Sequence, residues 1–356
     1  MLKVRKKKSE TLAELIRKNL QEFPFTAGTP VASSREIARK YNVSLSTADQ
    51  ALNHLVQEDF LYRSPGSGTF LKQDSQARSL HIGIADQIVS AQYLTPEINR
   101  ILDRHFEIAG QELSDLGCHL DLLSYQSMIQ SFQECGLDGL LMSINYIDPE
   151  SVRLMQEKKI PVVVYRHFQS VPEYSCVYYD YSVGMKSALE YLKIRKDEPV
   201  VLVYETTSCG RYIHSLWKEL LYSYGISEKN IISYDVCVKE RELTCYRLAR
   251  VNLSKFKGAA ILTSNDGLAA NLINALTLEN LVCGQDYRII GTENREAYGF
   301  EIGNRGPVIA SIHTPIEVMA KEAVKLLMYK INHEVDYTCQ LRIPTGFVPR
   351  LSSGHK

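Results

Sequence analysis

The 356-residue sequence lacks several features that would decide its class at once. Its eight cysteines show no C-x-x-C spacing and none precedes Cys118, so neither a disulfide framework nor a cysteine-based zinc site is indicated. No run of about 20 apolar residues is present, and we expect no membrane contact. The N-terminus, MLKVRKKKSE, leads into no apolar stretch, so we expect no secretory signal. Free thiols fit a reducing cytoplasm.

The sequence also lacks the motifs of common enzyme classes. It contains no G-x-S-x-G, G-x-x-x-x-G-K-[ST], H-E-x-x-H or G-x-G-x-x-G motif. Cys209, with Glu205 and His214 nearby in the chain, is the one arrangement worth considering as a nucleophile, and its surroundings do not support that role. We therefore expect no catalytic residues, no cofactor and no metal.

Charge is distributed unevenly along a chain of formal net charge zero. Residues 1–72 contain twelve Lys and Arg against seven Asp and Glu, a net charge of +5, which leaves −5 for the rest. A basic small part joined to an acidic large part indicates a polyanionic partner at one end only.

The basic part has the pattern of three helices and a hairpin. Leu12, Leu15, Ile16 and Leu20 form one apolar stripe; a second helix is expected after Ser34 as N-cap, and a third after Ser44. The segment FLYRSPGSGTFLK is typical of a β-hairpin with a Gly-rich tip. This pattern predicts a winged helix-turn-helix over residues 1–72, followed by a polar linker over 73–79.

From residue 80 to 350 the sequence predicts a two-lobed α/β body. Ten apolar runs, from HIGIAD at residue 81 to VIASIH at residue 308, alternate with helical segments, which favours parallel sheets covered on both faces. Ten strands exceed one ordinary sheet, so we expect two.

Polar side chains follow these strands, at the sheet edges where ligands bind in open parallel sheets. Each of them alone could be a helix cap or a turn residue, but the set favours a cleft for a hydroxyl-rich small molecule. The candidate effector residues are Asp86, Tyr93, Arg166, Asp180, Arg211, Asn265, Asp266, Glu293 and His313, with Phe168, Tyr179, Tyr181 and Tyr212 as further aromatic candidates.

The segment VASSREIARKYNVSLSTADQALNHLVQEDFLYRSPGSGTFL resembles the DNA-binding domain of the GntR family of bacterial regulators. The resemblance implies that the second helix, the third helix and the wing contact operator DNA, through Arg35, Ser44, Ser46, Thr47, Gly66 and Gly68. The sequence departs from the family pattern at Leu45, Asp49 and Ser67, where the family often has arginines.

These departures leave the third helix without a basic residue. Its hydroxyls still suit phosphates and bases, and Leu45 suits a thymine methyl group. Asp49 would repel phosphate or accept from cytosine N4, so we expect an operator unlike the usual family one. Positive charge must then come from Arg35, Arg39, Arg63, Lys72 and the Lys3 to Lys8 run, unless that run is a solvated tail.

The remaining residues resemble the effector domain of LacI-type repressors and periplasmic sugar-binding proteins, in segments such as TSNDGLAANLINAL and YRIIGTEN. The resemblance implies a homodimer and a sugar effector. It matches Arg211 to the arginine that clasps sugar hydroxyls. The position of Arg211, after the strand PVVLVYE and the turn TTSCG at the start of a helix, also predicts that it reaches across the cleft toward Asn265, Asp266 and Glu293 on the opposite wall.

Together these observations predict a cytoplasmic, ligand-responsive transcription regulator whose small sugar-like effector controls operator binding. Two alternatives remain open at this point. One is a regulator whose cleft takes a nucleobase, a peptide or nothing, with a protein partner providing the signal. The other is an α/β enzyme with an accessory DNA-binding head, which would need a nucleophile or a cofactor lysine at a strand end.

Overall fold

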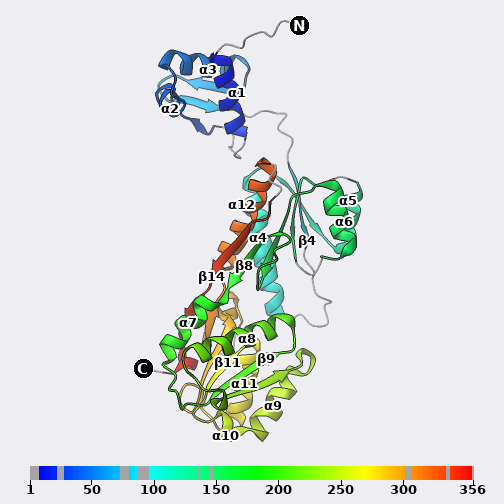
Figure 1. Ribbon diagram of the computed structural model, residues 1–356, viewed down its shortest axis with the longest axis vertical. Helices are drawn as coiled ribbons and strands as arrows, with labels where there is room; N and C mark the ends of the chain where they lie inside the picture. The colour runs from blue at the N-terminus through cyan, green and yellow to red at the C-terminus, as the bar shows by residue number, and fades with distance from the viewer. Residues whose placement is uncertain are drawn as a thin grey trace.

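The computed structural model describes residues 8–21, 28–72, 80–85, 96–134, 136–143, 147–300, 306–333 and 337–354. These residues form a small N-terminal domain with a three-stranded sheet, and a larger body with two six-stranded sheets (Figure 1). The predicted winged helix-turn-helix and the predicted two-sheet α/β body are both confirmed. Asp86, Tyr93 and residues 3–7 of the basic run lie outside the described residues.

The N-terminal domain packs three helices on an antiparallel sheet of order β1-β3-β2. Its core contains Ile16 and Leu55, but Leu15 is exposed; Ala13 is buried instead, which moves the buried stripe of the first helix. The elements are α1 (Lys8–Gln21), β1 (Pro30–Val31), α2 (Ser34–Lys40), α3 (Leu45–Gln57), β2 (Leu61–Ser64) and β3 (Gly68–Leu71).

The expected N-cap of the second helix is wrong by one residue. Ser33, not Ser34, caps α2, because its side chain accepts from the Glu36 amide while the Glu36 carboxylate accepts from the Ser33 amide, a reciprocal capping box. The hydroxyl of Ser34 is left to donate to Asp49. Ser44 caps α3 as predicted, accepting from the Thr47 amide.

The first lobe of the body is built on a sheet of order β14-β8-β7-β6-β4-β5, whose neighbouring strands are all parallel. Helices α4 and α12 run side by side along one face, and α5 and α6 cover the other (Figure 1). The elements are β4 (His81–Ala85), α4 (Pro96–Asp115), β5 (His119–Leu123), α5 (Tyr125–Gln133), β6 (Gly139–Met142), α6 (Pro149–Lys158), β7 (Val162–His167), β8 (Ser175–Asp180), α12 (Ile316–His333) and β14 (Gln340–Pro344).

The second lobe has a sheet of order β10-β9-β11-β12-β13-β15, parallel except for β15. All ten predicted strands occur; β14 and β15 were not predicted. The elements are α7 (Tyr181–Leu192), β9 (Val200–Glu205), α8 (Ser208–Ser223), β10 (Ile231–Val236), α9 (Arg241–Val251), α10 (Leu253–Phe256), β11 (Ala260–Thr263), α11 (Asp266–Leu278), β12 (Arg288–Glu293), β13 (Ala310–His313), β15 (Gly346–Val348) and the 3-10 turns Glu228–Asn230, Val238–Glu240, Arg295–Tyr298 and Leu351–Ser353.

The chain passes between the lobes three times, after β8, after β13 and between β14 and β15. Two of these crossings touch: Thr345 donates through its amide and its hydroxyl to the Asp180 carbonyl oxygen, at 3.2 and 2.8 Å. Gly184 lies against the same crossing, where a Cβ atom would stand 2.3 Å from the Gly346 carbonyl oxygen. The lobes are therefore joined by closely packed backbone segments.

Among the described residues, no helix has the length and apolar character needed to cross a lipid bilayer.

Candidate functional site

The N-terminal end of α3 presents small and apolar side chains to solvent. Leu45 is 51% exposed, Ser46 is exposed, and the hydroxyl of Thr47 lies 2.7 Å from that of Ser44 at the helix cap. The cap hydroxyl is therefore shared between the helix backbone and Thr47. Leu45 and Ser46 are the residues of this turn that are free to face a partner.

Asp49, one turn further along α3, is held by three neighbouring groups. Its Oδ1 accepts from Arg63 at 2.8 Å and from the Ser34 hydroxyl at 3.0 Å, and its Oδ2 accepts from Asn53 at 3.4 Å. The hydrogen bonds from Arg63 and Ser34 lower the pKa of Asp49, which keeps the carboxylate ionised. Asp49 and Arg63 therefore neutralise each other and tie α3 to α2 and to the wing strand β2.

Two further basic groups and the wing tip complete this surface. Arg35 and Arg39 are exposed on α2. At the tip of the β2–β3 hairpin, Gly66 and Gly68 have φ values of 78° and 123°, conformations that favour glycine, and Ser67 between them is exposed. The sequence-predicted DNA-contacting residues thus lie on one small domain, on α2, α3 and the wing.

In the body, the two sheets meet at the carboxyl ends of their parallel strands. Arg166, near the end of β7 in the first lobe, has a φ of 60°, an uncommon conformation for a side chain of this size. Burial lowers the pKa of its guanidinium to about 10, while the nearby Tyr179 and Glu293 act to raise that pKa. Because Glu293 ends β12 of the second lobe, charged groups of the two lobes interact electrostatically here.

A cluster of buried charges surrounds Glu293 in the second lobe. Arg295 Nε lies 2.5 Å from Glu293 Oε2, and Arg241 Nη2 lies 2.5 Å from Glu205 Oε1. The Arg295 guanidinium also interacts electrostatically with Asp266 and Glu205, so the carboxylates and guanidinia form one network. Within the described part of the chain, the buried Nε of Arg241 has no hydrogen-bond partner.

Several predicted effector residues also stabilise the fold through hydrogen bonds within the protein. Asn265 Oδ1 caps α11 by accepting from the Leu268 amide, and Asp180 caps α7 by accepting from the Ser182 amide. Asp266 is fully buried; it accepts from the Ser311 hydroxyl and from the Arg295 amide, both at 2.6 Å. These three residues are at strand ends as expected, but their polar atoms have partners within the protein.

Arg211 has a different position from the one expected. It is exposed on α8, and its Nη2 donates to the Thr206 carbonyl oxygen at 2.9 Å. Strand β9, which precedes it, belongs to the same sheet as β11 and β12, so Asn265, Asp266 and Glu293 do not lie on the opposite wall. That part of the expected geometry is wrong, because it rested on the place of Arg211 after its own strand and not on the order of the strands in the sheet. The role of Arg211 in effector binding stays a prediction.

Aromatic and apolar groups flank the charged network. The Phe168 ring, after β7, lies 5.2 Å from the Tyr212 ring on α8, centroid to centroid, so an aromatic pair also joins the two lobes. Tyr179 and Tyr181 contact edge to face at 6.0 Å. His313 Nδ1 accepts from the Asn294 side-chain amide at 3.1 Å, and burial lowers the pKa of His313, which favours the neutral imidazole.

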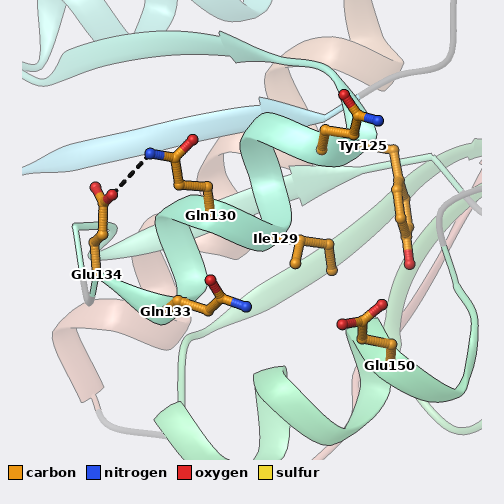
Figure 2. A pocket seen from close by; sticks show the side chains of 7 residues that line it. Tyr125, Ile129, Gln130, Gln133, Glu134 and Glu150 are labelled. Atoms are coloured by element: carbon orange, nitrogen blue, oxygen red, sulfur yellow. Dashed lines mark hydrogen bonds between the residues drawn. The ribbon is translucent and has the colours of Figure 1, made fainter.

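A hollow lies on the outer face of the first lobe. It measures about 530 Å³ and is lined by α5 residues together with Glu150 of α6 (Figure 2). Its polar groups pair locally, since Gln130 donates to Glu134 at 2.8 Å, and the Tyr125 hydroxyl bonds to Asp148. None of the sequence-predicted site residues lines it.

Sequence reasoning missed Arg241 and Arg295. Arg295 comes directly after the Glu293-Asn294 pair that ends β12, so a strand-end search extended by one residue would have found it. Arg241 begins α9, five residues beyond the end of β10, and only the fold brings it to Glu205.

Comparison with known families assigns both parts of the chain. Residues 8–71 match the model of the bacterial regulatory proteins of the gntR family, and residues 200–353 match the model of a periplasmic binding protein-like domain. The first part is a gntR-type DNA-binding domain. The chain is therefore a transcriptional regulator with a periplasmic-binding-protein-like effector domain.

Relatives of the regulator have the same role. The transcriptional regulator RegA of Clostridium acetobutylicum is 24% identical over 316 residues, which are 85% of this chain and 93% of RegA. The transcriptional repressor NagR of Bacillus subtilis is 26% identical over 206 residues, which are 55% of this chain and 82% of NagR.

Solved structures of LacI-family regulators share the fold of the regulator's body. One from Enterococcus faecium with bound ribose has a TM-score of 0.59 at 18% identity and covers 77% of this chain and 98% of its own. One from Weissella paramesenteroides with bound glucose has a TM-score of 0.57 at 16% identity, covering 76% and 97%. The lac repressor dimer bound to operator has a TM-score of 0.60 at 15% identity, covering 79% and 96%.

Proposed function

We propose that the regulator binds operator DNA as a homodimer and that a sugar or sugar derivative in the interlobe cleft controls this binding. The observation that carries the proposal is the contact of the two lobes through the Phe168 and Tyr212 rings, 5.2 Å apart centroid to centroid, together with the electrostatic interaction of Arg166 of the first lobe with Glu293 of the second. The lac repressor has been observed as a dimer on its operator, and two LacI-family relatives in fold hold ribose and glucose.

The chemistry of the cleft suits a hydroxyl-rich ligand. Guanidinium groups donate two parallel hydrogen bonds and carboxylates accept them, and adjacent sugar hydroxyls can do both. The buried Nε of Arg241 provides a donor for such a ligand, and the aromatic rings of Phe168 and Tyr212 provide a face for a sugar ring. Arg166, Arg241, Glu205 and Glu293 are therefore the residues that we assign to effector binding, together with the earlier candidates.

A ligand in this position can control operator binding through the arrangement of the lobes. Arg166 and Glu293 belong to different lobes, so a ligand that binds both stabilises one arrangement of the lobes over others. A change in that arrangement alters the positions of the two DNA-binding domains of a dimer, and hence their fit to the operator. Effector and operator affinities must then be coupled reciprocally.

We propose further that the regulator is not an enzyme and acts in the cytoplasm. Burial raises the pKa of the Cys209 thiol to about 12, with Glu293 and Glu205 adding to the effect, whereas a nucleophilic cysteine needs a lowered pKa. His214 bonds to Ser233, so it is not positioned as a base for Cys209. The seven cysteines of the described residues are free thiols, as in reducing compartments. We also propose that residues 1–72 are the DNA-binding domain, residues 73–79 the linker, and residues 80–350 the effector-binding and dimerisation domain.

A thermal-shift screen with monosaccharides and sugar phosphates tests the effector proposal. A true effector at 100 times its dissociation constant adds about 2.7 kcal/mol to the free energy of unfolding. Arg166→Gln should raise the required ligand concentration at least tenfold, because a bond to a charged group contributes about 1.5–3 kcal/mol. Arg153→Gln, which alters an exposed arginine of the same lobe that pairs with Glu157, is the matched control.

The same screen shows whether Arg166 or Arg211 anchors the effector. If Arg211→Ala weakens the response and Arg166→Gln does not, the effector is anchored at α8, and our cleft assignment is wrong. If neither variant changes the response, the ligand binds outside this cleft.

A further inference from the structure

A cluster of two histidines and an aspartate lies far from the interlobe cleft, at the amino-terminal ends of β4 and β5. The two strands pair in parallel, with His81 beside His119 and Gly83 beside Asp121. Side chains two residues apart along a strand share a face, and paired residues of neighbouring strands share it too. His81, His119 and Asp121 are therefore brought to one face of the sheet by strand pairing, although His81 is distant from the other two in sequence.

The Asp121 carboxylate lies between the two imidazole rings. Its Oδ2 is 2.7 Å from His81 Nε2, and its Oδ1 is 3.6 Å from His119 Nε2. The two rings are 4.9 Å apart, centroid to centroid, and one ligand atom from each residue lies within 4.8 Å of the other two. Ligand atoms around a tetrahedral ion with bonds of about 2.0–2.1 Å are roughly 3.4 Å apart. Small side-chain rotations would therefore place all three atoms on one ion.

The cluster is both accessible and held on rigid backbone. The side chains of His81, His119 and Asp121 are 31%, 67% and 41% exposed, so an ion can enter and water can complete its coordination. The strand starts are fixed, because the His81 amide donates to the Asp138 carboxylate at 2.8 Å and the His119 amide donates to the Leu80 carbonyl oxygen at 2.7 Å. Ligands on paired strands of a six-stranded sheet are well preorganised.

We propose that His81, His119 and Asp121 form a three-ligand site for a divalent transition-metal ion, with Zn²⁺ as the best match. Two imidazole nitrogens and one carboxylate oxygen suit Zn²⁺, whereas Mg²⁺ and Ca²⁺ prefer oxygen ligands alone. The bound ion joins β4, the first strand after residues 73–79, to the edge strand β5. The site is independent of the effector proposal, since it shares no residue with the interlobe cleft.

Isothermal titration calorimetry of the full chain, stripped with a chelator and then titrated with ZnCl₂, tests the site. We expect the wild type to bind one equivalent, and His119→Ala and Asp121→Asn each to bind at least tenfold more weakly. His119 is mostly exposed, so its removal leaves the core intact. His333→Ala, which removes an exposed histidine at the end of α12, should bind like the wild type, and MgCl₂ should give no comparable heat.

Cobalt provides a second readout that separates this site from the cysteines. Co²⁺ bound by nitrogen and oxygen gives visible d–d bands without a sulfur-to-cobalt charge-transfer band, and His119→Ala should lose those bands. The proposal is overturned if the wild type binds no Zn²⁺, if both variants bind as tightly as the wild type, or if the sulfur band appears. Circular dichroism shows whether each variant is folded. If one of them is not, the Zn²⁺ affinity of the other variant tests the site.

Discussion

At the scale of single residues, contacts within the protein decide which charges remain available to a partner. Asp49 stands on α3 where the GntR pattern has an arginine, yet Arg63 from the wing compensates its charge at 2.8 Å. The pair is half exposed, so it contributes little to stability. Neither residue therefore acts as a free charge toward DNA. We expect Arg35 on α2 to contribute more of the attraction to the phosphates.

Substitutions of Arg35, Asp49 and Arg63 should change DNA affinity and its salt dependence in different ways. On a DNA site selected from a random pool, Arg35→Ala should weaken binding and reduce the log-log salt slope by about 0.9, the contribution of one phosphate contact. Arg63→Ala should weaken binding more strongly, because it leaves the Asp49 carboxylate unpaired near phosphates. Adding Asp49→Ala to Arg63→Ala should restore part of the affinity. Fluorescence anisotropy over a salt series measures both quantities; an unchanged slope in Arg35→Ala would show that Arg35 does not face DNA.

Asp266 gives a prediction of pH dependence. Burial raises its pKa to about 7, although the hydrogen bonds from Ser311 and Arg295 act to lower it. The folded state then binds the proton more tightly than the unfolded state, whose carboxyl has its ordinary pKa of 3.8. The protonated form stabilises the fold most at low pH, and this contribution, on the order of 4 kcal/mol, is lost as pH rises through about 4 to 7.

Asp266→Asn isolates that contribution. The amide can accept from the Arg295 amide and donate to Ser311, so it imitates the protonated acid at every pH. We expect the stability of the variant relative to the wild type to increase as pH rises from about 4 to about 7 in urea unfolding. A constant difference across that range would mean that Asp266 is not protonated in the folded protein.

At the scale of helices and strands, short polar side chains decide where helices begin. Ser33, Ser44, Ser124, Asp148, Asp180, Thr207 and Asn265 each accept a hydrogen bond from a backbone amide in the first turn of the following helix. Two of these residues, Asp180 and Asn265, were also predicted effector ligands. A cap of this kind contributes to the fold whether or not the residue meets a ligand.

Ser44→Ala should therefore destabilise α3 by about 1 kcal/mol, because the Thr47 amide loses its acceptor. Hydrogen exchange of the α3 amides measures this as roughly fivefold lower protection. Ser46→Ala changes an exposed hydroxyl of the same turn and should leave protection unchanged while weakening DNA binding. Equal protection in both variants would show that the cap does not limit the opening of α3.

At the scale of the whole molecule, the three crossings between the lobes control how the lobes can move. The crossing between β14 and β15 passes Gly184 so closely that a methyl group would stand 2.3 Å from the Gly346 carbonyl oxygen. Thr345 binds the first crossing through the Asp180 carbonyl oxygen. Backbone contacts of this kind leave no room for a larger residue.

Gly184→Ala is expected to lower the free energy of unfolding by about 1–3 kcal/mol, since one of the crossings must shift to admit the methyl group. Gly136→Ala is the matched control, because a Cβ atom there would stand 4.0 Å from the Ser131 carbonyl oxygen, an ordinary van der Waals distance. Thermal melting compares the two variants. If Gly184→Ala melts like Gly136→Ala, the crossing is looser than its geometry indicates.

The sequence by itself determined the winged domain, the ten main strands of the body and the polar groups at their ends. Each depends on local patterns: apolar runs, hydroxyl caps, and glycines with φ above zero at the wing tip. The tertiary structure alone decided that Arg63 neutralises Asp49 and that Arg241 reaches Glu205. It also added β14 and β15 and left Arg211 exposed on α8. These features depend on which distant segments pack together. The spacing of residues within one segment does not determine that packing.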